Sequence, residues 1–307
     1  MSVYTDDQLS RYFKRIEFKP TTANDVRKQV QKSPLATLAR LQRAHMCHVP
    51  FESITLHYST HRTLSIDPED LFEKIVVNNR GGYCMEVNTF LATVLRSLGY
   101  TLISAGGRVS AGFPYKGWSH MVNLVLISGT RHLVDVGFGS HGATRPVPLQ
   151  HGLEFPIADT FRGRLEYRAL DMHTDRDQRL WVFSSRESDG DAWRENYAFA
   201  ELEFFPADFA VMNMSTSAAP QSYFVQNVLA EKTMDMGGEE DEVPVGVIVL
   251  FRDYVKIREG GEWKVVAKLE TEAQRIGALC KFFGITMSLR EEKAIRRLAS
   301  ELKGKAV

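Results

Sequence analysis

Apolar residues in the first hundred positions recur at helical spacing. A first helix is predicted behind a polar cap, where apolar side chains recur every three or four residues at Leu9, Tyr12, Phe13 and Ile16. A second helix is predicted to begin at Pro34 and to end at His48, because Pro50 disfavours helix at the residue before it. A third is predicted to start within Ile66–Asp70. The N-terminal part is therefore predicted to be a helical bundle.

From residue 100 the pattern changes to short runs rich in β-branched residues, which are typical of strands. The runs are Thr101–Ala105, Met121–Ile127 and Arg131–Val136, followed by Glu166–Leu170 and Leu180–Phe183. The segment Ser128–Thr130 is short enough to be a turn between the second and third strands. Neighbouring strands joined in this way are antiparallel. The middle of the chain is therefore predicted to be an antiparallel sheet or barrel.

The last hundred residues mix the two patterns. A helix is predicted at Pro206–Asn213, and an acidic stretch, Gly237–Glu242, is predicted to be a solvated loop. Three strands around a glycine turn and two closing helices are predicted at Val247–Phe251, Tyr254–Ile257, Trp263–Lys268, Thr271–Phe283 and Ser288–Leu302. The whole pattern predicts an α+β fold with an N-terminal helical bundle (1–99), a central antiparallel β-barrel (100–215) and a C-terminal α/β domain (216–307).

Composition narrows the class of protein. The chain has 307 residues, and its 38 basic and 38 acidic residues cancel, so no net field attracts nucleic acid or an anionic membrane. No apolar run approaches the roughly 18 residues that a membrane span needs. Three cysteines are too few for a disulfide framework, and the polar N-terminus is unlike a signal peptide. We therefore expect a cytoplasmic protein without nucleic-acid or membrane partners.

The most informative stretch surrounds Cys84. Gly81 and Gly82 allow a tight approach of the chain just before it, and a helical apolar pattern follows at Phe90, Leu91, Val94, Leu95 and Leu98. Cys84 is therefore predicted to lie at or near a helix N-terminus, where unpaired N–H groups and the helix dipole favour a thiolate. A cysteine in that position is suited to nucleophilic attack.

A base and an orienting group follow in the β region. His120 precedes a predicted strand at the end of the loop Tyr115–His120, and Asp135 lies within the apolar run of the next strand. A carboxylate in such a run is costly unless it is paired. Two antiparallel strands joined by a short turn would bring Asp135 close to His120, which would fix the imidazole tautomer and turn the other nitrogen toward Cys84. The order predicts a nucleophile, a base and its orienter.

Each of these residues alone is more often structural, and only the combination favours catalysis. A metal site is a further alternative, because His45–His48 holds two imidazoles and a thiol. Zinc ligands usually come in pairs from two separate segments, and there is no second cluster in the sequence. We therefore expect packing at a helix end, and no metal.

The cysteine segment also resembles a known motif. Arg80–Asn88 is similar to the Arg-Gly-Gly-x-Cys-x-Glu-Leu-Asn pattern of the arylamine N-acetyltransferase family, with Val87 in place of leucine. His120-Met121 and Val134–Gly139 match the histidine and aspartate segments of that family. The resemblance covers residues 10–225 in order, and the C-terminal remainder matches only in general character.

Two further segments carry the resemblance with changes. His48–Glu52 is similar to the family's Pro-Phe-Glu-Asn segment, but Ser53 stands in place of asparagine. The stretch from Asn213 to Phe224 resembles another family segment, with Ala218 where threonine is common.

The resemblance implies a papain-like Cys-His-Asp triad in a fold whose C-terminal domain acts as a lid. It implies ping-pong acyl transfer from acetyl-CoA to an arylamine, arylhydrazine or N-hydroxyarylamine, with Cys84 as nucleophile, His120 as base and Asp135 as its orienter. Coenzyme A contacts are implied for Lys116, Gly117, Ser217 and Ser222, and substrate contacts for Ser119, Gly137, Phe138 and Gly139.

Alternatives remain at this level. The same triad would serve a cysteine hydrolase or a transglutaminase-like enzyme. The donor could be another short acyl-CoA, since some relatives use malonyl-CoA. Lys116 or Arg108 could then meet a donor carboxylate, although a solvated role is more usual for such cations. The oligomeric state is not predicted.

We also expect an ion pair between Arg80 and Glu52 behind Cys84, since both lie in segments that look buried.

Overall fold

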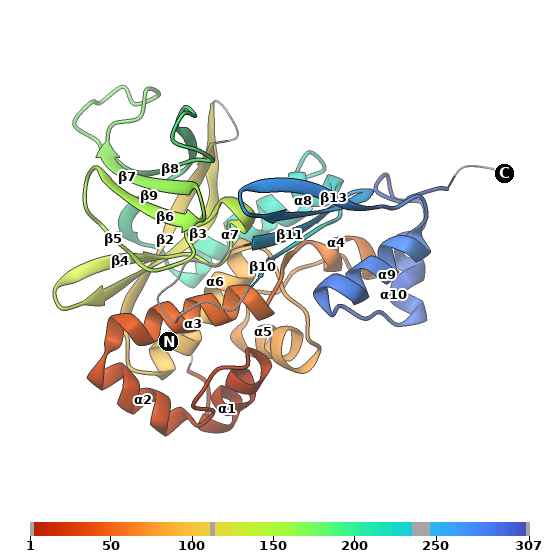
Figure 1. Ribbon diagram of the computed structural model, residues 1–307, viewed down its shortest axis with the longest axis horizontal. Coiled ribbons are helices and arrows are strands. Elements are labelled where there is room, and N and C mark those ends of the chain that lie inside the picture. The colour runs from red at the N-terminus through yellow and green to blue at the C-terminus, as the bar shows by residue number, and fades with distance from the viewer. Residues whose placement is uncertain (1–2, 111–113, 235–245, 305–307) are drawn as a thin grey trace.

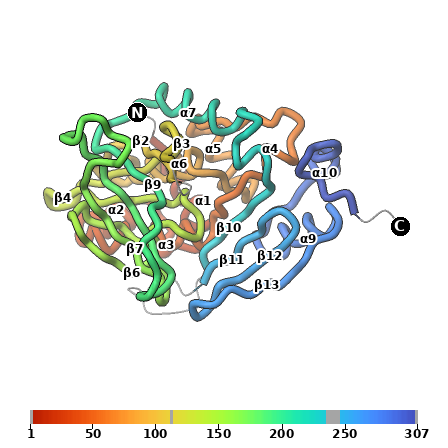
Figure 2. The backbone as a smooth tube through the Cα atoms, turned by 90° about the horizontal axis from the view of Figure 1, so that it is seen from above, coloured from red at the N-terminus to blue at the C-terminus, as the bar shows by residue number. Residues whose placement is uncertain are grey.

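The computed structural model describes residues 3–110, 114–234 and 246–304. It has a mixed helix and sheet fold. The helices of residues 6–48 lie at the bottom of Figure 1, an eight-stranded sheet lies at the upper left, and a smaller sheet with the C-terminal helices lies at the right. Figure 2, turned by 90°, again places the larger sheet at the left and the smaller one at the right. Residues Gly237–Glu242, predicted to form an acidic loop, lie outside the described residues.

The N-terminal helices are built as the apolar spacing predicts. Their bounds are α1 Asp6–Arg15, α2 Ala23–Lys32, α3 Pro34–His48, α4 Ile54–Tyr58, α5 Pro68–Phe72 and α6 Cys84–Ser97. A π-helical turn, η1 (Glu73–Val77), continues α5. Thr5 caps α1 in a box with Gln8, and the apolar faces of α1 and α6 meet at Tyr12 and Phe90, which are fully buried. Helices α2 and α4 are additions to the prediction.

The larger sheet is antiparallel throughout and forms a nearly closed barrel. Its spatial order is β5-β4-β3-β2-β9-β8-β7-β6. The bounds are β2 Thr101–Ser110, β3 Tyr115–Ile127, β4 Thr130–Val134, β5 Val147–Pro148, β6 Leu153–Ala158, β7 Phe161–Arg168, β8 Leu180–Arg186 and β9 Arg194–Glu203. An apolar core fills the interior, with Phe155, Phe183 and Phe199 among its buried rings. The antiparallel middle region is thus confirmed.

Two local predictions for this sheet are wrong. Tyr115–His120 is not a loop but the first half of β3, which pairs with β2 across two bulges, so the polar residues there lie on a strand. Strand β4 ends at Val134, so Asp135 lies just after the strand and not within it. Pairing with β2 overrides the weak local preference of the first segment.

The smaller sheet joins the two ends of the chain. Its order is β1-β10-β11-β12-β13, with β1 Phe51–Glu52, β10 Leu229–Met234, β11 Gly246–Phe251, β12 Tyr254–Glu259 and β13 Glu262–Lys268. Gly260 and Gly261 form the predicted hairpin turn with positive φ. Because β1 comes from the N-terminal part and pairs with β10, this sheet includes residues from both ends of the chain. The domain limits at 99 and 215 stay a prediction.

Four helices complete the chain, namely α7 Pro206–Ala218, α8 Tyr223–Gln226, α9 Glu272–Phe283 and α10 Leu289–Ala294. The predicted helices at 206 and 271 are confirmed, and α7 is longer than expected. The last helix is shorter than predicted, since α10 ends at Ala294 instead of continuing to Leu302.

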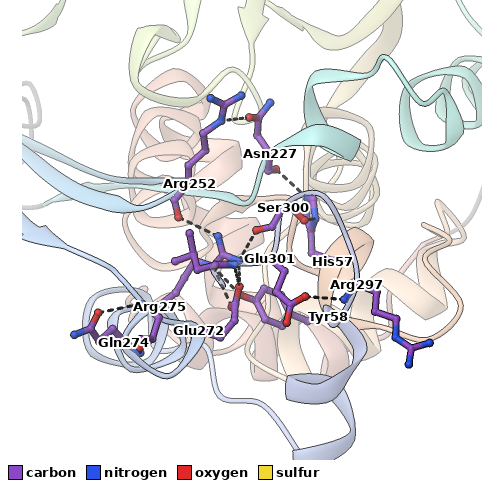
Figure 3. A network of polar contacts seen from close by, with 12 residues as sticks. His57, Tyr58, Asn227, Arg252, Glu272, Gln274, Arg275, Arg297, Ser300 and Glu301 are labelled. Atoms are coloured by element: carbon purple, nitrogen blue, oxygen red, sulfur yellow. Dashed lines mark hydrogen bonds and ion pairs between the residues drawn. The ribbon is translucent and has the colours of Figure 1, made fainter. Parts of the chain in front are cut away.

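Arg275 on α9 ties the C-terminal part to α4 (Figure 3). Its side chain is 1% exposed, and its Nε donates to the Tyr58 hydroxyl at 2.9 Å. Its terminal nitrogens donate to the carbonyls of Arg252 at 3.1 Å and Ser300 at 2.8 Å, and it forms an ion pair with Glu272. Each nitrogen of the guanidinium is therefore engaged within the protein.

Replacing Arg275 by methionine should destabilise the protein. The change keeps an unbranched apolar stem but leaves the Glu272 carboxylate without its counter-ion and two carbonyls without their donor, which should cost about 3–5 kcal/mol of unfolding free energy. Urea unfolding would measure it, with Lys281→Met, an exposed position on the same helix, as the control. Equal midpoints for the two variants would contradict this account.

Candidate active site

Cys84 is the first residue of α6 and is 3% exposed. Close packing explains the two glycines before it. A Cβ on Gly81 would lie 1.7 Å from the Pro50 carbonyl oxygen, and one on Gly82 would lie 2.7 Å from Cβ of Glu86. Neither glycine has a positive φ, so space and not backbone conformation requires them.

A buried ion network lies behind the cysteine turn. The Lys74 ammonium is 2.6 Å from a Glu86 carboxylate oxygen and 3.9 Å from a Glu52 oxygen. The other Glu86 oxygen accepts from the Tyr83 N–H at 3.1 Å, and Glu52 accepts from the Gly81 N–H at 3.2 Å. These two carboxylates therefore hold the backbone of the turn that carries Cys84.

The predicted ion pair between Arg80 and Glu52 is wrong. Arg80 reaches outward to Glu291 on α10, with 2.7 Å between the charged atoms. Lys74 takes its place beside Glu52, because η1 brings that side chain behind the turn. Burial opposes the charge of Lys74, but Glu86 and Glu52 more than offset it and raise the pKa of the ammonium above 10.5.

His120 and Asp135 form a closely hydrogen-bonded pair. His120 Nε2 lies 2.7 Å from Asp135 Oδ2, and the two side chains are 2% and 0% exposed. Burial alone would lower the pKa of His120, but the charge and hydrogen bond of Asp135, with a further contribution from Cys84, raise it from 6.5 to about 10. The partners of His120 thus favour its imidazolium form.

Asp135 is held in its ionised form by three groups. Burial would raise the pKa of its carboxyl, but the charge and hydrogen bond of His120 lower it below the usual 3.8. Asn88 Nδ2 and the Gly137 N–H also support the anion, each donating to Asp135 Oδ1 at 2.8 Å. The carboxylate therefore has a donor on each oxygen.

The structure brings the three predicted catalytic residues together. Because His120 Nε2 faces Asp135, Nδ1 is the nitrogen left for Cys84, which acts on the imidazole as both a hydrogen-bond and a charge partner. The Cys84 thiol sulfur is also 3.8 Å from the Ser119 carbonyl oxygen. This arrangement can hold a thiolate beside an imidazolium, the pair needed for nucleophilic attack followed by proton transfer.

Three side chains of the site were not identified from the sequence. Asn88 is one turn after Cys84 on α6. Its position within the Arg80–Asn88 motif is the sequence feature that could have identified it. Gln42 on α3 donates to the Asp135 carbonyl at 3.4 Å. Tyr197 on β9 packs its ring against His120 with 4.6 Å between centroids. Gln42 and Tyr197 come from distant elements, so no local pattern marks them.

Phe138 and its neighbouring glycines line the same region. The Phe138 ring meets the His120 ring edge-on, with 5.2 Å between centroids, and lies 4.7 Å from the Tyr197 ring. A Cβ on Gly137 would lie 2.5 Å from Cα of Cys84, so only glycine fits there. Gly139, with φ +69°, passes so close to Glu231 that a Cβ would meet its carboxylate at 2.5 Å.

The residues predicted to contact coenzyme A lie in different settings. Lys116 is exposed, and a side chain on Gly117 would meet open space. Ser217 and Ser222 donate their hydroxyls to the carbonyls of Asn213 at 2.7 Å and Thr216 at 2.5 Å. Their roles stay predictions.

Ser119, predicted to contact substrate, differs from these serines. Its hydroxyl is buried and has no partner among the described residues, although its carbonyl contacts Cys84. A polar group of a bound molecule could supply that partner. Its role also stays a prediction.

Two negative findings apply to the described residues. They include no cluster of histidine, cysteine, aspartate or glutamate that could hold a metal ion. No helix among them has the length and apolar character needed to cross a membrane.

Comparisons with known proteins identify the family of the chain. A family model described as N-acetyltransferase matches residues 34–291. N-malonyltransferase FDB2 of Fusarium pseudograminearum is 37% identical, over 96% of this chain and 94% of its own. Arylamine N-acetyltransferase of Escherichia coli is 30% identical, over 75% of each chain.

Solved structures show the same fold. The arylamine N-acetyltransferase of Mycobacterium abscessus superposes with a TM-score of 0.79 at 22% identity, over 96% of this chain and 95% of its own. The Mycobacterium marinum enzyme, solved in complex with CoA, gives 0.75 at 26% identity, over 94% and 99%. The fold and these relatives define an acyltransferase that uses an acyl-CoA as co-substrate. The chain belongs to the arylamine N-acetyltransferase family.

Replacing Asp135 by asparagine should remove the proton held on His120. Burial then acts on the imidazole without the carboxylate charge, so its pKa should fall well below about 10. An NMR titration of the His120 ring would follow this change, and Asp177→Asn, at an exposed position, provides the control. The same titration curve for His120 in both variants would refute the ion pair.

Proposed function

We propose that the protein moves an acyl group from a short acyl-CoA to an arylamine, arylhydrazine or N-hydroxyarylamine through an acyl-Cys84 intermediate. The observation that carries this proposal is the buried His120–Asp135 pair beside a cysteine at a helix N-terminus. The same three residues would be a papain-like triad, with Cys84 as nucleophile, His120 as acid and base, and Asp135 as its orienter.

In the first half-reaction the Cys84 thiolate attacks the thioester carbonyl of the acyl-CoA. The tetrahedral intermediate collapses, the bond to coenzyme A breaks, and the leaving thiolate takes the proton from the His120 imidazolium. Glu86 and Val87 donate their amides to the Tyr83 carbonyl at 3.0 and 3.1 Å. The Cys84 N–H comes before these bonded amides, where a helix leaves its donors unpaired, so it is placed to stabilise the oxyanion.

In the second half-reaction the amine attacks the carbonyl of acyl-Cys84. Neutral His120 accepts the proton that the amine loses, and the bond to Cys84 breaks to restore the thiolate beside the imidazolium. Asp135 keeps the same ring nitrogen of His120 engaged throughout, so the other nitrogen serves both half-reactions. This is ping-pong transfer, since coenzyme A leaves before the amine reacts.

The proposed donor is malonyl-CoA, with acetyl-CoA as the second candidate. The support is that relatives 36–37% identical over 96% of the chain are named N-malonyltransferase, whereas the bacterial acetyltransferase match is 30% identical over 75%. For the acceptor, the Phe138 and Tyr197 rings beside His120 offer faces and edges to an aromatic amine. Ser119, Gly137 and Gly139 are proposed to complete that pocket.

We propose that coenzyme A lies against Lys116, Gly117, Ser217 and Ser222, as the family resemblance implies. The exposed ammonium and the open space around Gly117 support the first two positions. The two serines can accept a further hydrogen bond while donating to the backbone. The cytoplasm is the proposed compartment, supported by a total of three cysteines, too few for a disulfide framework.

Incubation with malonyl-CoA in the absence of amine should leave a malonyl adduct on Cys84, which intact-protein mass spectrometry would detect. Aniline should then discharge the adduct. Cys84→Ala should lose both the adduct and about 10³-fold or more of the transfer rate, while its circular dichroism is unchanged. Cys280→Ala, an exposed cysteine, is the control. Thioester hydrolysis without any adduct would instead indicate the cysteine hydrolase alternative.

A further inference from the structure

A malonyl group brings a negative charge into the site. Its free carboxylate lies one methylene beyond the thioester carbonyl. When the malonyl group is attached to the Cys84 sulfur, this carboxylate therefore lies among the residues that surround Cys84. Those surroundings are apolar, with Leu56, Leu64, Met85, Met121, Phe209 and Met212 in the same buried cluster as Cys84. An unpaired carboxylate there is costly, so a malonyl-transferring enzyme needs a cation within reach.

The cations near the turn that carries Cys84 are already used. The charges of His120 and Asp135 neutralise each other. Lys74 is held between Glu86 and Glu52, and Arg80 is paired with Glu291.

Strand β3, which carries His120, and its neighbour β2 provide two further cations, Lys116 and Arg108. Lys116 is exposed, where a solvated ammonium discriminates weakly between anions and neutral groups. Arg108 is half-buried. This contrast favours Arg108 as the cation for a buried carboxylate.

The sheet register places Arg108 next to the catalytic strand. Gly107 lies opposite His120, and Arg108 lies opposite Trp118. The Arg108 guanidinium carbon is 4.1 Å from the centre of the Trp118 ring, and that ring packs against the Cys84 cluster. A single tryptophan therefore connects the guanidinium with the surroundings of the nucleophile.

The guanidinium has unused capacity for a ligand. Its one polar contact among the described residues is a 3.4 Å hydrogen bond to the Lys116 carbonyl, and no carboxylate of those residues is paired with it. Burial lowers the pKa of Arg108, as expected for a partly desolvated cation without a counter-ion. A guanidinium donates two parallel hydrogen bonds to a carboxylate, so an acyl group ending in one would fit it.

We propose that Arg108, held on the Trp118 ring, binds the free carboxylate of a malonyl group on Cys84 and sets the preference for malonyl-CoA over acetyl-CoA. This inference rests on the proposed acyl transfer through Cys84. The acetyl group of acetyl-CoA ends in a methyl group, which cannot accept a hydrogen bond from the guanidinium. Arg108 therefore changes the preference between the two donors only by binding the malonyl carboxylate.

The test compares kcat/KM for malonyl-CoA and acetyl-CoA with one arylamine in the wild type and in Arg108→Gln. The ratio of malonyl to acetyl values should fall about 10- to 100-fold, the usual effect of losing a hydrogen bond to a charged group. Arg108→Lys keeps the charge without the paired donors and should recover part of the ratio. Thermal unfolding of both variants checks that they are folded, and the lysine variant provides the test if the glutamine variant is not.

Arg164→Gln is the matched control. Arg164 also stacks on a tryptophan, Trp193, at 4.6 Å, but it lies on β7, toward the far edge of the larger sheet. Its donor ratio should match that of the wild type. An unchanged ratio in Arg108→Gln, whether kcat/KM falls equally for both donors or for neither, would overturn the inference.

The wild type separates this inference from the proposed function. A wild type that uses acetyl-CoA at least as well as malonyl-CoA would overturn the role of Arg108 but leave acyl transfer intact. A wild type that forms no acyl-Cys84 with either donor would refute the proposed function itself.

Discussion

The hydrogen-bonded pair of His120 and Asp135 is the interaction on which the site depends. Two groups buried to this extent would each lose their charge to desolvation if they were alone, so each remains ionised only because the other is there. The desolvation cost of the buried carboxylate is offset by hydrogen bonds from the surroundings of Asp135. Asn88 and the Gly137 N–H both donate to its second oxygen, so a change in either neighbour should act on the imidazole through the carboxylate.

Helix α6 connects this pair with the nucleophile. It begins with Cys84, and one turn later it supplies Asn88, which also donates to the Met121 carbonyl at 2.8 Å and accepts from the Val136 N–H at 3.1 Å. One rigid element therefore fixes the distance between the thiol and the two segments that carry His120, on β3, and Asp135, just after β4. Behind the helix, the Lys74 network holds the turn from the other side. Polar contacts of Asn88 on one side and of Glu86 on the other thus hold the N-terminal part of α6.

The sequence predicted the parts of this arrangement that local chemistry determines. Cys84 at a helix start, the grouping of Cys84, His120 and Asp135 and the antiparallel middle region follow from spacing and strand patterns. Contacts between distant segments could not be predicted in that way. Arg80 was expected to pair with Glu52 because both looked buried, but the choice between Arg80 and Lys74 depends on η1, which apolar spacing does not reveal. The ring of Tyr197 reaches His120 only through sheet pairing.

The central claim is that coenzyme A leaves before the amine reacts. Rapid mixing of the protein with malonyl-CoA in the absence of amine, while free coenzyme A thiol is measured, tests it most directly. The account predicts a burst of one coenzyme A per active site that then stops, and resumes when aniline is added. Steady release without amine would indicate hydrolysis. No release until aniline is present would show that the acyl group passes directly from donor to acceptor, and would contradict an acyl-Cys84 intermediate.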